Sequence, residues 1–132
     1  MLSPIQFIEV RGVKREVLIT PSLYKIVKER GWEIKVDSDF ASIQSGYIKL
    51  IYAGVLNFHQ TKKYDNPEIE DCDVTLIDVE IWAALHSKEF TQMISEVFEL
   101  LTGKPLKEVV VEKEQEKKKS GHLSGIIRKI FS

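Results

Sequence analysis

The chain has 132 residues, a length that fits one domain built around a single hydrophobic core. Apolar residues make up 43% of the chain and charged residues 30%, a composition typical of folded globular proteins that excludes a wholly disordered chain. The formal net charge is −1, so the chain lacks the positive field by which proteins bind nucleic acid non-specifically.

Charge is unevenly distributed along the sequence. Residues 65–80 contain seven acidic residues and no Lys or Arg, whereas the sequence is rich in lysine from Lys113 onward. The single cysteine, Cys72, excludes an intramolecular disulfide and gives no sign of an oxidising compartment. The first residues carry no signal-peptide pattern, and no stretch reaches the roughly 18 apolar residues that a membrane span needs. We therefore expect a cytoplasmic protein.

The first elements expected are a β-hairpin and a short helix. Residues 5–10 and 14–19 are rich in β-branched side chains and are separated by a loop of three residues that includes a glycine, which predicts the hairpin. Pro21 stands where a helix can begin, with Thr20 as its N-cap. Gly31 is expected to end this helix in a left-handed conformation.

The most apolar segment of the chain is residues 46–60. Its apolar side chains lie nearly all round a helix, which predicts a buried helix. A helical turn is expected before it at 37–45, and the boundary between the two stays open. Gly54 stands in its interior, where Gly costs roughly 1 kcal/mol relative to Ala and usually marks a close approach between helices. Core packing is the interpretation that we favour for Gly54. A polar turn is expected at 64–67.

Two further helices are expected, at 75–86 and 87–101. Thr75 and Asp78 resemble a capping box at the start of the first. Its predicted apolar stripe consists of Ile77, Ile81, Trp82 and Leu85. The second has the clearest helical pattern in the chain and should end at Gly103. We expect the two to form an antiparallel or steeply angled pair against the long buried helix.

The C-terminal part of the sequence differs from the rest. Residues 112–120 offer no apolar side chain to bury, which favours a solvated helix extension or a flexible linker. A short amphipathic segment follows, with apolar residues Leu123, Ile126, Ile127, Ile130 and Phe131. The predicted fold is therefore mainly α (α+β), with an N-terminal β-hairpin and a compact bundle of about four to five helices over 1–108. We expect residues 109–132 to form a flexible C-terminal tail that holds the charged linker and the short amphipathic segment.

The sequence offers no recognisable catalytic or metal-binding constellation. Cys72 lies between Asp71 and Asp73, whose charges disfavour the thiolate that a nucleophile needs. A metal site built from Asp71, Asp73 and His86 is an alternative, but the histidines have no ligand spacing and acidic runs are usually solvated. We predict no catalytic residue, no metal and no cofactor.

Nucleotide and nucleic-acid binding are also disfavoured. The glycines are isolated, so no phosphate-binding loop can be built from them. The lysines of the tail are diluted by glutamates, and no aromatic residue is interleaved with them for base stacking. Protein binding remains the leading functional class.

The order of these elements resembles that of the tail assembly chaperones of long-tailed bacteriophages and prophages. The features that carry the resemblance are the segment YIKLIYAGVLNF with its Ala-Gly pair at 53–54, and a threonine-initiated helix containing Asp-Val-Glu at 78–80. A final amphipathic helix follows, and the resemblance covers roughly residues 5–103.

The resemblance implies a non-enzymatic protein of the bacterial host cytoplasm. Such a chaperone would bind and solubilise the tape measure protein during tail assembly, until tail tube subunits replace it. A longer product made by ribosomal frameshifting near Lys117–Lys119 is part of this expectation, and homo-oligomerisation stays open. The residues that we predict to contact a partner are Tyr47, Tyr52, Trp82, Leu123, Ile126, Ile127, Ile130 and Phe131.

Other functions remain open on the sequence alone. The chain can be a small cytoplasmic helical adaptor, or a membrane-peripheral protein that inserts the apolar residues of 123–131 with Arg128 and Lys129 near the headgroups. A DNA-associated regulator would need an exposed basic recognition helix, which the sequence does not offer. An enzyme with an unrecognised site is the least favoured alternative.

Overall fold

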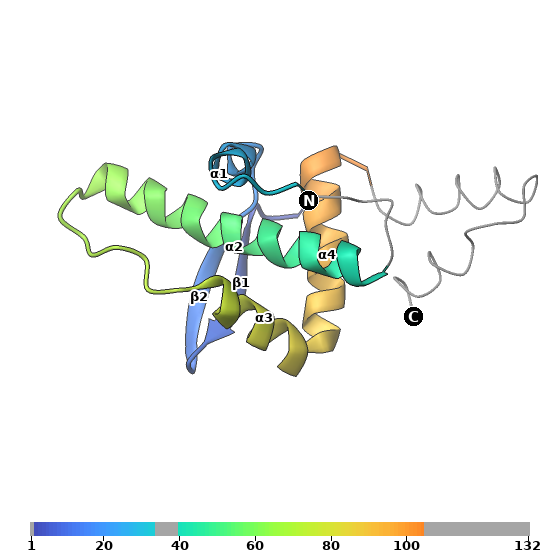
Figure 1. The fold of residues 1–132 in the computed structure, drawn as a ribbon. Coiled ribbons are helices and arrows are strands. Elements are labelled where there is room, and N and C mark those ends of the chain that lie inside the picture. The colour runs from blue at the N-terminus through green and yellow to red at the C-terminus, as the bar shows by residue number, and fades with distance from the viewer. Residues whose placement is uncertain (1, 34–39, 105–132) are drawn as a thin grey trace, which may run out of the picture.

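The computed structural model describes residues 2–33 and 40–104 (Figure 1). It has an N-terminal antiparallel β-hairpin followed, within these ranges, by four helices, which confirms the predicted α+β class. The predicted tail and the boundary at 108/109 lie outside the described residues. The elements are β1 (Ile5–Val10), β2 (Val13–Leu18), α1 (Leu23–Glu29), α2 (Phe40–Asp65), α3 (Leu76–Leu85) and α4 (Ser87–Thr102).

The hairpin turn is one residue shorter than predicted. Val10 pairs with Val13, so the loop consists of Arg11 and Gly12 alone and β2 begins at Val13. Both loop residues have positive φ, +52° and +74°, as a type I′ turn requires. This turn matches the right-handed twist of the strands, which explains why the shorter loop is preferred.

Helix α1 begins later than predicted, because Ser22 and not Thr20 is its N-cap. The Thr20 hydroxyl is occupied elsewhere: it accepts a hydrogen bond of 3.0 Å from the side-chain amide of Asn57 on α2. Asn57 is itself buried and also donates to the main-chain oxygen of Leu18 at 3.1 Å. These bonds attach α2 to the end of β2. Gly31 has φ +67°, as predicted for the end of this helix.

Helix α2 is a single helix of 26 residues, so the expected helical turn and the buried helix are continuous from Phe40 onward, and the predicted end at Gln60 is wrong. No proline interrupts the sequence until Pro67, and the helix continues to Asp65. At about 1.5 Å per residue it is ~39 Å long. It runs across the hairpin with α1 and α3 on opposite sides of it, and its last turns project beyond the core (Figure 1).

Gly54 marks the place where α2 lies closest to the hairpin. A Cβ atom at this position would lie 2.5 Å from Cγ1 of Val17 and 2.9 Å from Cδ1 of Ile19. The predicted close approach is therefore present, but the neighbour is strand β2 and not another helix. Val17 and Ile19 are almost fully buried, so this contact lies in the centre of the core.

Helices α3 and α4 meet at a steep angle after a one-residue connection, His86 (Figure 1). The rings of Trp82 and Phe90 pack edge to face across this corner, 6.1 Å apart. Helix α4 buries Phe90, Met93, Ile94 and Val97, as its pattern predicts, and ends at Gly103 with φ +75°. Helix α3 also packs against α2 and β1. Across the described ranges, none of the helices is long and apolar enough to cross a bilayer.

Candidate functional site

Among the side chains that the structure describes, α3 exposes more large apolar residues than any other helix. Ile77, Ile81 and Leu85 are 63%, 53% and 75% exposed, although each is a large aliphatic side chain. They recur every four residues, and Ala84, also exposed, lies beside them on the same face, on the side of Glu80. We call these four residues the α3 stripe.

The α3 stripe is exposed because the opposite face of the helix is the one that packs. Val79, Trp82 and Ala83 are buried against the rest of the core. Every position of α3 except Asp78 and Glu80 is apolar, so the helix has two apolar faces and only one of them finds a partner within the described residues. The sequence prediction that Ile77, Ile81 and Leu85 share the core-facing stripe with Trp82 is therefore wrong.

The N-terminal end of α3 is held firmly in place. Thr75 and Asp78 form the predicted capping box: the Asp78 carboxylate accepts from the Thr75 main-chain N–H at 2.8 Å, and the Thr75 hydroxyl accepts from the Asp78 N–H at 3.3 Å. Arg11 at the hairpin turn adds an ion pair of 2.8 Å to Asp78 and one of 2.9 Å to Asp73. The stripe is thus presented by a fixed helix.

Two carboxylates lie beside the stripe, and one of them, Asp78, pairs with Arg11. About 100° of rotation separates successive residues of a helix, which places Asp78 along one side of the stripe and Glu80 along the other. Hydrogen bonds from the Thr75 main chain, and then from Arg11, hold the pKa of Asp78 below its usual value. The Arg11 guanidinium does the same to the pKa of Asp73. Both carboxylates therefore stay ionised at neutral pH.

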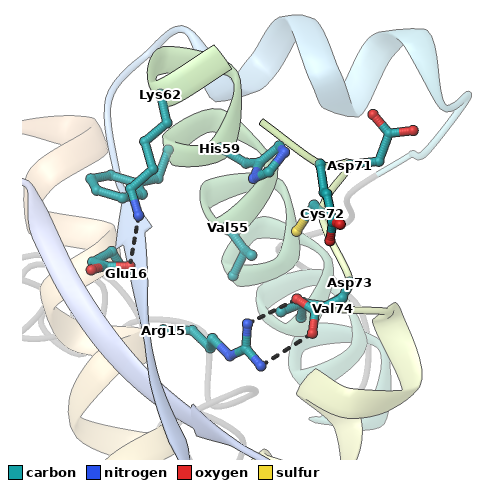
Figure 2. A pocket seen from close by; sticks show the side chains of 11 residues that line it. Arg15, Glu16, Val55, His59, Lys62, Asp71, Cys72, Asp73 and Val74 are labelled. Carbon is teal, nitrogen blue, oxygen red and sulfur yellow. Dashed lines mark hydrogen bonds and ion pairs between the residues drawn. The ribbon is translucent and has the colours of Figure 1, made fainter. Parts of the chain in front are cut away.

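A second feature is an open hollow of about 360 Å³ between α2, β2 and the segment before α3 (Figure 2). Its charged groups are mostly paired with one another. Arg15 contacts Asp73 at 2.8 Å, and Lys62 lies 3.8 Å from Glu16. Two buried nitrogens, Nε of Arg15 and Nε2 of His59, have no hydrogen-bond partner among the residues that the structure describes.

The hollow does not assemble a reactive constellation from the residues named by the sequence. Cys72 is partly buried at its edge. Asp71 pairs with Lys63, whose ammonium lowers the pKa of that carboxyl, and Asp73 pairs with two arginines. His86 lies apart from them and stacks on Trp82 at the α3–α4 corner. Over residues 2–33 and 40–104, no three His, Cys, Asp or Glu side chains could hold a metal ion together.

The structure places three of the predicted partner contacts in the core. Tyr47, Tyr52 and Trp82 are 6%, 7% and 5% exposed. These three side chains pack within the hydrophobic core. That they contact a partner stays a prediction. The other predicted contacts, Leu123, Ile126, Ile127, Ile130 and Phe131, lie outside the described residues.

Sequence reasoning missed the α3 stripe as a surface although it identified the residues. The sequence did contain a signal: α3 is apolar on nearly all sides and follows an acidic run, so that either the face of Trp82 and Ala83 or the face of Ile81 could be the buried one.

A scan against protein-family models finds no match, and searches of curated proteins and of solved structures find no similar chain.

Proposed function

We propose that this protein is a non-enzymatic tail assembly chaperone that binds an apolar helical segment of a tape measure protein through the α3 stripe. The observation that carries the proposal is the exposure of Ile77, Ile81 and Leu85 on a helix that is fixed at its N-terminal end. Apolar residues at this spacing form one half of a helix-to-helix contact, in which a partner helix lays its own apolar face on the stripe.

The size of the stripe favours weak, reversible binding. Full burial of an Ile or Leu side chain is worth about 1.5–3 kcal/mol, so three of them contribute at most ~9 kcal/mol. Loss of translational and rotational freedom on association costs an estimated ~4–15 kcal/mol. A single site of this kind therefore releases its client readily. Such exchange suits a chaperone that keeps a long client from aggregating and is later displaced by tail tube subunits.

The sequence supports the same proposal independently of the stripe. The hairpin, the Ala-Gly pair of α2 and the threonine-capped α3 follow one another in the order seen in tail assembly chaperones. The acidic residues beside α3 favour a client whose apolar helix carries basic residues, because opposite charges raise the rate of encounter.

The proposal is tested with a tape measure protein, which is to be sought as a long helical reading frame directly downstream of the coding sequence. This client is co-expressed with the wild-type protein or with variants, and its soluble fraction is measured. Ile81→Asp should lose the solubilising effect, because it places a charge in the centre of the stripe. Tyr24→Asp is the matched control: Tyr24 is 50% exposed on α1, on the other side of α2 from α3 (Figure 1).

Two results would contradict the proposal. One is a client that stays equally soluble with Ile81→Asp and with the wild-type protein. The other is coding DNA with no slippery heptamer near the lysine run and no long helical reading frame downstream, which would favour the alternative of a helical adaptor for another protein.

A further inference from the structure

We propose that residues 123–131 of the same chain dock on the α3 stripe and compete there with the client. The competition rests on the function proposed above, whereas the docking itself does not. The occupant is identified by three properties: its apolar spacing, its charge and the reach of the chain that tethers it.

The apolar spacing of the segment is complementary to the stripe. Leu123, Ile126, Ile127, Ile130 and Phe131 stand at positions i, i+3, i+4, i+7 and i+8. Peptides that lay a helix on an apolar surface use anchors at this spacing. The α3 stripe offers the matching surface, with aliphatic side chains at 77, 81 and 85 and the small Ala84 beside them.

The charges are complementary as well. From Lys117 to the C-terminus the chain has five basic residues and no acidic one. The stripe is bordered by Asp78 and Glu80, and Glu80 forms no ion pair with any residue that the structure describes. A second copy of the chain would instead bring another α3 with the same acidic borders, and like charges in contact disfavour that arrangement.

The tether is long enough for docking within one molecule. Helix α4 has 16 residues and is therefore ~24 Å long, and it begins next to the end of α3. Residues 105–122 span at most about 60 Å when fully extended, at ~3.3 Å per residue. The chain can thus return from the end of α4 to the stripe. Covalent linkage also gives the segment an effective concentration near the stripe of roughly millimolar order, which compensates for weak contacts.

Docking predicts that a pair of engineered cysteines forms a disulfide within one chain. In a full-length Cys72→Ser background, Ala84→Cys on the stripe is combined with Ser124→Cys in the segment, which preserves every large apolar residue of both. The control pair combines Ser124→Cys with Tyr24→Cys on α1, on the other side of α2 from α3. The equilibrium with glutathione gives the effective concentration of each thiol pair.

We expect the 84–124 pair to show an effective concentration at least about tenfold above that of the 24–124 pair. Adding Ile127→Asp should remove the difference, whereas Ser120→Asp, which introduces the same charge outside the apolar segment, should leave it in place. Equal effective concentrations for both pairs would overturn the proposal. So would 84–124 disulfides that link two chains with a yield that rises with protein concentration, because the occupant would then be a second copy.

Competition is tested separately from docking. Oxidised 84–124 protein should fail to solubilise the client, and reduction should restore that ability. A locked chain that still solubilises the client would overturn competition at the stripe. The cross-linking assay contains no client and therefore tests docking alone. If it shows no docking while Ile81→Asp still abolishes solubilisation of the client, the inference about residues 123–131 is wrong and the proposed function stands.

Discussion

The substitution Gly54→Ala tests the contact between α2 and the hairpin at the centre of the core. It adds one methyl group at a point where the strand leaves no room. The new Cβ would lie 2.5 Å from Cγ1 of Val17 and 3.3 Å from the main-chain oxygen of Leu18. Val17 is completely buried, so it cannot turn into solvent to relieve the overlap.

Two opposing effects set the magnitude. Replacing Gly by Ala inside a helix contributes about 1 kcal/mol of stability. Overpacking a filled core costs typically ~1–3 kcal/mol, and here the upper part of that range applies because one of the contacts is with backbone. We expect a net loss of about 1–2 kcal/mol in the free energy of unfolding. For a chain of this size that lowers Tm by roughly 4–8 °C.

The assay is urea unfolding of the wild-type protein, Gly54→Ala, Val17→Ala and the double variant. Val17→Ala removes the methyl group that the new Cβ would meet, so Gly54→Ala should cost less in that background. The two substitutions should be coupled by ~0.5–3 kcal/mol. A Gly54→Ala protein that is more stable than the wild type, or strictly additive effects, would refute the proposed close contact.

Four further predictions concern stability. Thr75→Ala should lower the free energy of unfolding by about 1 kcal/mol in urea, because it removes the N-cap of α3. Asn57→Leu should cost ~1–3 kcal/mol by the same measurement, because the partly buried carbonyl of Leu18 loses its donor. The Arg11 hydrogen bond lowers the pKa of Asp73 from 3.8 in the folded state, so the stability that Asp73 contributes is present above pH 3.8 and is lost below it. When the urea midpoint of unfolding is measured against pH, Arg11→Met should reduce the fall of the midpoint at acid pH. Burial raises the pKa of Tyr47 to about 12, so ionisation of this side chain should favour unfolding between about pH 10 and 12, and a Tyr47→Phe protein should lose less stability there.

Local signals in the sequence identified most of the elements. Two short runs rich in β-branched residues predicted both strands, and the regular spacing from Phe90 to Val97 predicted the buried face of α4. The capping box at Thr75 and the left-handed glycines at 31 and 103 are also local, because each depends on residues within one turn of itself. The same reasoning failed at the N-cap of α1, where the Thr20 hydroxyl is taken by Asn57, a residue far away in the sequence.

The candidate site was decided by the tertiary structure. The sequence by itself determined that α3 is a helix and that it is apolar on nearly every side. It could not determine which side faces the core, because Ile77, Ile81 and Leu85 satisfy the helical period as well as Val79 and Trp82 do. That choice depends on the surfaces that α2 and β1 offer, and on the ion pairs between Arg11 and the start of α3 that fix its rotation. Burial is a property of the neighbours as much as of the residue, and the neighbours come from distant parts of the chain.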